Sequence, residues 1–280
     1  MTAIEVVDGA CVEYVLRSQG DRLAVLFHGG GHMRAQLEIG HETFLEAGWS
    51  VLQPARPGYG RTPLSAGPDN AAFADRIASL CERPGYRDVA AVGVAAGGRT
   101  AMTFAARHPG LVHGLILESS TSFLPWPDPF TRAIARIAFR PHLERGTWAI
   151  TRLLFSRWPA FTLKGMLSSL STIPASIAYQ RFDETERTKL IGLLSRMRSG
   201  QGFANDLCMS ADVTQDVRQP TLVVASRFDA VVSREHAQSL VSRIKGAELV
   251  LTNSLSHLIW IGPHADEEQQ AVTSFLARLR

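Results

Sequence analysis

The chain has 280 residues, of which 45% are hydrophobic and 20% charged, and its formal charge at pH 7 is +3. This composition excludes a disordered, fibrous or membrane-spanning protein and is enough for one or two α/β domains with a large core. The cationic side chains are scattered along the sequence and form no continuous run, so no nucleic-acid partner is expected.

Short apolar runs bounded by turn residues alternate with helical patterns up to about Ser120 and again from Thr221. Asp8-Gly9 separates the first two runs, which is typical of a hairpin. Strands are expected at Ile4–Val7, Cys11–Leu16, Leu23–Phe27, Ser50–Pro54, Val89–Gly93, Val112–Glu118, Thr221–Ala225 and Glu248–Thr252. Apolar strands between helices are what a parallel sheet covered on both faces requires. The sequence therefore predicts an α/β fold with a mostly parallel sheet that opens with an antiparallel pair.

Residues 121–214 interrupt this alternation, because their apolar residues recur at helical spacing. We expect a helical cap there, inserted into a core made of residues 1–120 and 215–280. The segment is rich in aromatic residues, among them Phe123 and Trp126. A cap over the carboxyl ends of a parallel sheet lies where such sheets bind ligands, so these two are predicted to contact a large, mostly apolar substrate.

The stretch Val92–Gly98 reads as a turn from a strand into a helix, with Gly93, Gly97 and Gly98 in the positions of a nucleophile elbow. In a G-x-S-x-G elbow the middle residue is a serine that stands above the sheet. Here Ala95 occupies that position. Glycines at this spacing have no obvious use without a nucleophile, so we interpret Ala95 as a replaced serine.

A second glycine cluster, His28 to Gly31, follows the strand expected at Leu23–Phe27. Backbone N–H groups in such a turn can stabilise a developing oxyanion. We predict Gly30 and Ala96, the residue after the nucleophile position, as the two donors. His28 is expected to hold the loop, whereas His32 is expected near the substrate.

Two further residues follow the last two predicted strands in the order that an acyl-transfer triad requires. Asp229 comes after Thr221–Ala225, and His257 after Glu248–Thr252. A histidine can take the proton of a nucleophile when a carboxylate fixes its tautomer. Asp229 is the expected carboxylate, and Glu118, at the end of another strand, is the rival.

Together these motifs resemble the α/β-hydrolase superfamily over nearly the whole chain, with Ala95 as the departure. The resemblance implies a capped serine esterase or lactonase that acts on a small-molecule ester, with Ala95, Asp229 and His257 at the catalytic positions. The stretch 198–207 is similar to a segment of macrolide esterases, which open antibiotic lactone rings. The resemblance therefore implies a carboxylic ester hydrolase in an inactive form.

Two other interpretations stay open on the sequence alone. One is a natural binder of small molecules without catalysis, and the other is a cofactor-free lyase or dioxygenase that uses a His–Asp pair as its base. No metal or organic cofactor is expected, because no cluster of histidines and acids has ligand spacing.

The localisation expected from the sequence is cytoplasmic. Residues 1–8 lack the basic start and apolar stretch of a signal peptide, and no apolar run has the length of a membrane span. Cys11, Cys81 and Cys208 are widely spaced, which favours a reducing compartment over a disulfide framework. We accordingly expect no membrane partner, while the oligomeric state does not follow from the sequence.

Overall fold

The computed structural model describes residues 2–30, 40–140, 142–208 and 210–279. They form one 8-stranded sheet with the strand order β1-β2-β4-β3-β5-β6-β7-β8. The strands are β1 (Thr2–Val7), β2 (Ala10–Arg17), β3 (Arg22–Phe27), β4 (Ser50–Pro54), β5 (Asp88–Val94), β6 (Val112–Glu118), β7 (Thr221–Ser226) and β8 (Glu248–Thr252). β2 pairs antiparallel with both β1 and β4, and the strands from β3 to β8 pair parallel. The predicted fold class is confirmed.

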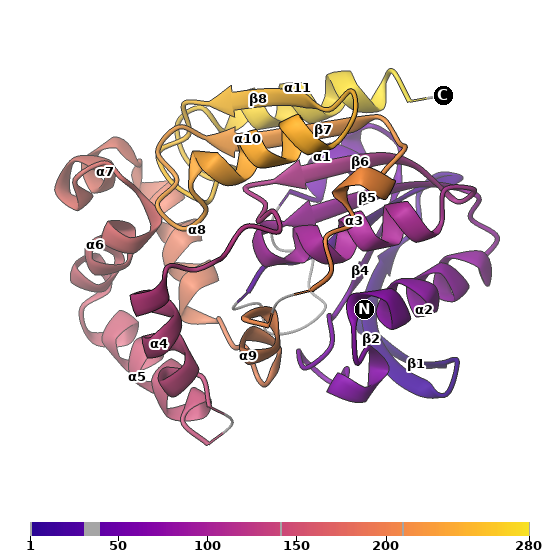
Figure 1. The fold of residues 1–280 in the computed structure, drawn as a ribbon. Helices are drawn as coiled ribbons and strands as arrows, with labels where there is room; N and C mark the ends of the chain where they lie inside the picture. Colours follow the sequence, from indigo (N-terminus) through magenta and orange to yellow (C-terminus); the bar gives the residue numbers. More distant parts are fainter. Residues whose placement is uncertain (1, 31–39, 141, 209, 280) are drawn as a thin grey trace.

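Helices cover both faces of this sheet (Figure 1). On one face, α2 (Asn70–Glu82), α3 (Gly98–Arg107) and α10 (Arg234–Arg243) share a core cluster with the sheet. On the other face, α1 (Glu42–Glu46) and α11 (Ala265–Leu276) share a second cluster. β7 is buried along its whole length, and β3 and β5 are buried after their first residue, because apolar helix faces cover both of their sides.

The chain between β6 and β7 forms helices α4 (Pro129–Ala138), α5 (Glu144–Arg157), α6 (Pro159–Leu170), α7 (Ala175–Arg181), α8 (Glu184–Ser195) and α9 (Gly202–Asp206). We call α4–α9 the helical insertion. Its helices lie together beyond the carboxyl ends of the parallel strands (Figure 1). Leu163, Leu190 and Phe182 belong to its own core cluster, which Leu255 and Leu258, beyond β8, complete. The insertion therefore packs directly on the loop that follows the last strand.

Local sequence signals account for where these helices begin. α8 starts with a capping box, in which Asp183 Oδ1 accepts from Glu186 N and Glu186 Oε2 accepts from Asp183 N, each at 2.7 Å. At the start of α4, Asp128 Oδ1 accepts from the N–H groups of Phe130 and Thr131, and Pro129 takes the first helical position.

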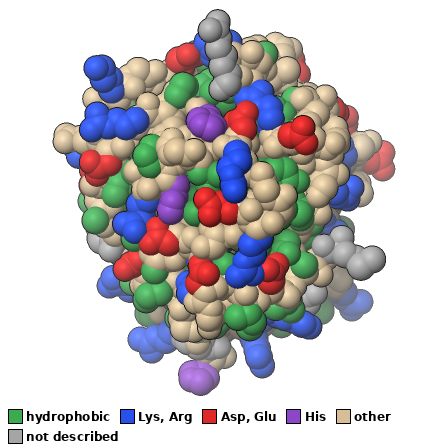
Figure 2. Space-filling model, turned by 90° about the vertical axis from the view of Figure 1, so that its right-hand side faces the viewer, with side chains coloured by type: hydrophobic (Ala, Val, Ile, Leu, Met, Phe, Trp, Pro, Cys, Tyr) green, Lys and Arg blue, Asp and Glu red, His purple; other side chains and the backbone are tan. Residues whose placement is uncertain are grey.

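The side of the molecule at the right of Figure 1 lies away from the insertion and faces the viewer in Figure 2. On this side, acidic and basic side chains are intermingled, and hydrophobic side chains are dispersed among them (Figure 2). Within the described ranges, no helix is long and apolar enough to cross a membrane.

Candidate active site

The turn between β5 and α3 has the backbone of a nucleophile elbow. Ala95 has a φ of +48°, which is rare for a residue other than glycine. A 3-10 turn over Ala95–Gly97 links the strand to the helix, and the Ala95 carbonyl accepts from Thr121 N at 3.0 Å. Ala95 lines a cavity between the sheet and the helical insertion. The turn thus has a strained backbone at a residue whose side chain has no reactive group.

The glycines of the elbow are required by close packing. A Cβ atom on Gly97 would overlap the carbonyl oxygen of Phe27, and one on Gly98 would overlap Ser120 Oγ. At Gly93 a Cβ would lie 2.5 Å from Gly98 Cα. The expectation that these glycines are useless without a nucleophile is therefore wrong, because the contact between strand, turn and helix needs them whatever residue stands at position 95.

Asp229 and His257 meet at the carboxyl ends of β7 and β8. His257 Nδ1 lies 2.7 Å from Asp229 Oδ2, and both side chains are buried. The other carboxylate oxygen of Asp229 accepts from the N–H groups of Val231 and Val232 at 2.8 and 2.9 Å. Because Oδ2 accepts a hydrogen bond from the Nδ1–H group, Nδ1 keeps its proton and Nε2 is left as the basic nitrogen of the ring. The pair has the arrangement of a base and the acid that orients it.

The insertion and the residue that follows β6 both hold His257 in place. Its backbone N–H donates to Leu170 O, at the end of α6, at 2.8 Å. Its carbonyl accepts from Ser119 Oγ at 3.0 Å. Ser119 also has a positive φ, of 44°. Ser119 was not predicted from the sequence, since a serine just after a strand carries no signal of this role.

Glu118, the rival acid, contacts other groups. Its Oε2 accepts from Trp260 Nε1 at 3.0 Å, and the buried carboxyl of Glu268 lies beside it. Burial raises the pKa of Glu118 to about 7 and also raises the pKa of Glu268, to which the charge of Glu118 adds. In the described structure it is Asp229, not Glu118, that contacts His257.

The loop after β3 lies directly against the elbow. A Cβ atom on Gly29 would lie 3.0 Å from Ala95 Cβ, and Gly30 lines the same cavity as Ala95 and His257. His28 is buried: its Nδ1 donates to Gly29 O at 2.8 Å, and its Nε2 accepts from Arg56 N at 3.0 Å. It therefore ties the loop to the chain after β4. His32 lies outside the described residues.

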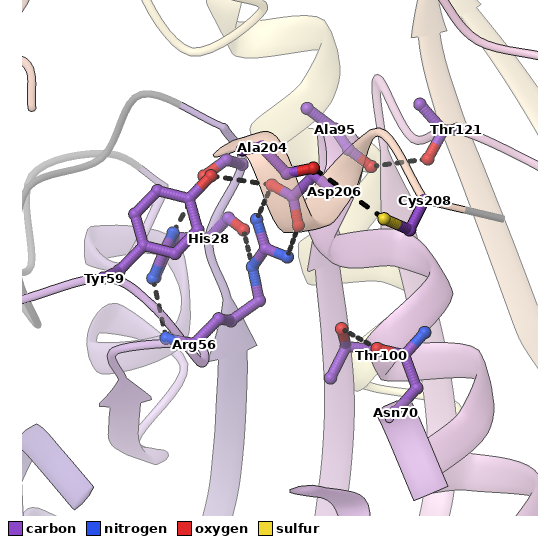
Figure 3. Close-up of polar contacts among 11 residues, drawn as sticks. His28, Arg56, Tyr59, Asn70, Ala95, Thr100, Thr121, Ala204, Asp206 and Cys208 are labelled. Atoms are coloured by element: carbon purple, nitrogen blue, oxygen red, sulfur yellow. Dashed lines mark hydrogen bonds and ion pairs between the residues drawn. The ribbon is translucent and has the colours of Figure 1, made fainter. Parts of the chain in front are cut away.

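A buried ion pair joins the helical insertion to this loop region (Figure 3). The Arg56 guanidinium binds Asp206 of α9 through two bonds, Nη1 to Oδ1 at 2.5 Å and Nη2 to Oδ2 at 2.7 Å. Tyr59 Oη donates to the same carboxylate at 2.7 Å, and Arg56 Nε donates to His28 O at 2.7 Å. Asp206 belongs to the insertion, whereas Arg56 follows strand β4 of the sheet. The ion pair therefore fixes α9 against the sheet.

The segment before Asp206 packs on the turn after β4. The N–H groups of Gln201 and Gly202 donate to the Gly58 carbonyl at 3.0 and 3.1 Å. Gly58 has a φ of +85°, and a Cβ on Gly202 would overlap the Tyr59 ring. Phe203 follows and reaches the cavity, where it packs against Gly30. In the sequence, the stretch 198–207 was interpreted as similar to a segment of macrolide esterases. In the structure, it holds the insertion against the turn after β4.

Sheet and insertion enclose a cavity of about 690 Å³. Ala95, Gly30 and His257 line its base, and its walls are mainly apolar side chains of the insertion and of the loops after β7 and β8: Leu170, Leu193, Leu194, Met197, Phe203, Val231, Leu258 and Trp260. Trp126 lines the cavity, with its Nε1 donating to Val231 O at 2.7 Å. Phe123 does not, because its ring packs on the core cluster beneath α3, near Arg99. The contact of Phe123 with substrate stays a prediction, and Phe123 is not among the residues that line this cavity.

A histidine that the sequence analysis missed also faces this cavity. His236, on α10, is buried, and its Nδ1 accepts from Ser122 N at 3.0 Å. Burial, with a further contribution from Arg99, lowers its pKa to about 4. The ring is therefore neutral at pH 7, with its proton on Nε2. A lone histidine within a helix gives no sequence signal of this position.

Other polar groups of the wall are engaged within their own helix. Ser168 and Ser169 line the cavity, but their hydroxyls donate to the Gly165 and Met166 carbonyls at 2.6 and 2.8 Å. Neither has a histidine as hydrogen-bond partner. Across the described ranges, no group of three or more His, Cys, Asp or Glu side chains is placed to hold a metal ion.

Comparison with known proteins assigns the chain to a family. The model of the alpha/beta hydrolase family matches residues 24–271. The chain belongs to this family. An uncharacterised hydrolase, YcgS of Bacillus subtilis (strain 168), is 31% identical over 96% of each chain. This alpha/beta hydrolase is also similar to a 2-hydroxy-6-oxononadienedioate/2-hydroxy-6-oxononatrienedioate hydrolase of Pseudomonas sp, with 24% identity over 92% of this chain and 89% of that one. A thermophilic esterase from Thermogutta terrifontis has the same fold, with a TM-score of 0.68, 18% identity and coverage of 100% and 99% of the two chains.

Proposed function

We propose that this alpha/beta hydrolase has the site of a serine-type carboxylic ester hydrolase whose nucleophile is replaced by Ala95, so that the chain binds its substrate without cleaving it. The contact between His257 and Asp229, in a cavity that Ala95 also lines, is the observation that carries the proposal. The pair leaves a basic nitrogen free for a hydroxyl at position 95.

The proposed chemistry with a serine at position 95 proceeds in two steps. His257 takes the hydroxyl proton as the oxygen attacks the ester carbonyl, and the N–H groups of Gly30 and Ala96 stabilise the tetrahedral oxyanion. The protonated ring then gives its proton to the leaving alcohol. Water, activated by the same ring, hydrolyses the acyl-enzyme. In the chain as it stands, the first step has no nucleophile.

For the substrate we propose a large, mostly apolar ester or lactone, held between the sheet and the insertion acting as a cap. A cavity of about 690 Å³ lies in the range of sites for drug-sized ligands. Trp126 and Phe203 supply flat apolar walls, and the neutral ring of His236 can donate a hydrogen bond from Nε2 to a carbonyl or ether oxygen. A macrocyclic lactone is the specific candidate.

The test is the substitution Ala95→Ser, assayed with 4-nitrophenyl butyrate and with a macrolide lactone. Serine adds one hydroxyl to a side chain that already stands in the elbow conformation, so the fold is expected to tolerate it. Removing a catalytic serine costs on the order of a millionfold in turnover, and its restoration should produce hydrolysis well above background. The matched control is Ala95→Ser with His257→Ala, which should have no such activity.

Three outcomes would contradict the proposal. A folded Ala95→Ser protein that hydrolyses neither ester would refute the ester hydrolase. Turnover by the unsubstituted chain would instead favour chemistry by the His–Asp pair alone, as in a cofactor-free lyase or dioxygenase. Tight binding of the macrolide with no gain of hydrolysis in the serine variant would favour a pure binder.

A further inference from the structure

Large apolar side chains are exposed mainly on one part of the helical insertion. Of the thirteen large hydrophobic residues exposed in the described structure, eight lie between positions 129 and 164. The most exposed are Phe161 and Phe130, at 76% and 74%. The eight are Phe130, Ile134, Ile137, Leu143, Ile150, Leu153, Trp158 and Phe161. We call the exposed side chains of residues 129–164 the α4–α6 surface.

These residues are arranged on outward helix faces. In α4, the spacing of Phe130, Ile134 and Ile137 puts them on one face, while the buried Ala135 lies on another. In α5, Trp148 and Phe155 fill the buried face, so Ile150 and Leu153 are left outside. Because the inner faces are already packed, the core of the insertion does not explain the outer apolar residues.

The same segment concentrates positive charge. Residues 129–164 contain seven lysine and arginine residues and one carboxylate, Glu144. Glu144 is buried, and Arg198 binds it at 3.0 Å, so it does not offset the surface cations. The excess of six positive charges in this segment is larger than the +3 of the whole chain. The cations are four or more residues apart, which is why the sequence alone shows no basic run; they are Arg132, Arg136, Arg140, Arg145, Arg152, Arg157 and Lys164.

We propose that the α4–α6 surface adsorbs to an anionic lipid bilayer. Apolar side chains beside arginine and lysine are the composition of helices that lie in the membrane interface. A second copy of the chain is a poor partner, because a symmetric contact would bring this excess of positive charge against itself. On the side shown in Figure 2, away from the insertion, acidic and basic side chains are intermingled. The sequence-based expectation of no membrane partner rested on spanning segments and does not bear on adsorption.

The α4–α6 surface adjoins the cavity, so adsorption would bring the candidate site close to the lipid. Asp128 and Thr131 line the cavity, and Phe130 lies between them in sequence with its side chain exposed. The α4–α6 surface therefore begins at the cavity wall. An apolar molecule dissolved in the bilayer would have a short path from the lipid to the site.

The test is flotation of the full chain with vesicles of phosphatidylglycerol and phosphatidylcholine, compared with vesicles of phosphatidylcholine alone. We expect binding to the anionic vesicles and weaker binding in high salt. Phe130→Ser with Phe161→Ser should weaken binding at least tenfold, since both rings would lose their place in the lipid. Arg136→Gln with Arg152→Gln should weaken it about twenty-five-fold, at about fivefold for each charge near an anionic surface.

The matched control is Ile4→Ser with Val6→Ser, which removes two exposed apolar side chains from β1 and should leave vesicle binding unchanged. Circular dichroism of every variant checks that it is folded. Trp158 is the exposed tryptophan of the surface, so lipid-borne quenchers in anionic vesicles should reduce its fluorescence.

Several results would overturn the proposal. One is the absence of binding to phosphatidylglycerol vesicles. Another is equal loss of binding in the Ile4/Val6 control and in the Phe130/Phe161 variant. Loss of binding from the arginine substitutions with none from the phenylalanine substitutions would indicate a site for anions in general. A dimer in sedimentation velocity that Phe130→Ser with Phe161→Ser dissociates would make a second copy of the chain the occupant.

Discussion

The substitution Asp206→Asn is expected to destabilise the protein strongly, because it leaves a buried cation without its partner. The Arg56 and Asp206 side chains are only 4% and 6% exposed. Burial by itself lowers the pKa of Arg56, but Asp206 and Tyr59 together more than offset this and raise it, so the guanidinium stays charged. Breaking a buried ion pair by removing one partner costs about 3–5 kcal/mol. Asparagine keeps the shape of the side chain and one acceptor oxygen. The free energy of unfolding is therefore expected to fall by about 3 kcal/mol, the lower end of this range.

Equilibrium unfolding in urea, followed by circular dichroism and by tryptophan fluorescence, measures this loss. Glu248→Gln is the matched control, because Arg278 binds Glu248 with the same two-bond geometry, at 3.0 and 2.8 Å, on the surface. With both side chains more than half exposed, that pair should contribute about 0–1 kcal/mol. A free energy of unfolding that falls no more for Asp206→Asn than for Glu248→Gln would refute the reasoning that this ion pair holds α9 on the sheet.

Three further predictions concern the elbow and the two carboxylates near it. In the Ala95→Ser background, Asp229→Asn should lower kcat by about ten-thousandfold and Glu118→Gln far less, as measured with one activated ester; the reverse order would make Glu118 the orienting acid. Because the folded-state pKa of Glu118 is raised to about 7 from 4.5, its proton stabilises the fold at low pH, and this contribution is lost as the pH rises from about 5 through 7. Urea midpoints should show that decline, and Glu118→Gln should flatten it; an unchanged slope would contradict the burial argument. Gly97→Ala should destabilise the fold by several kcal/mol, because the new methyl group would clash with the sheet. Gly165→Ala, with open space around the new methyl group, should be neutral or stabilise the fold by up to about 1 kcal/mol. Similar urea midpoints for the two variants would show that the backbone of the elbow shifts to make room for the methyl group.

The sequence by itself determined the sheet. Every expected strand forms, with ends within two residues of the prediction, because a strand buried on both sides leaves a continuous apolar run between turn residues. The elbow was also readable, since its glycines lie within a few residues of one another. The order of Asp229 and His257 along the chain gave their positions after β7 and β8, where parallel strands bring loops together at one edge.

Only the tertiary structure decided which side chains meet. Glu118 ends β6 and Asp229 follows β7 at that edge, and their different contacts depend on partners distant in sequence, Trp260 for Glu118 and His257 for Asp229. Phe123 and Trp126 are three residues apart, yet one packs into the core and the other lines the cavity. Neither the place of His236 in the cavity wall nor the α4–α6 surface could be predicted from the sequence. A lone histidine and widely spaced cations form a site or a surface only when folding decides which helix faces are buried. Burial is a property of the assembled chain, and short-range patterns carry little information about contacts between distant segments.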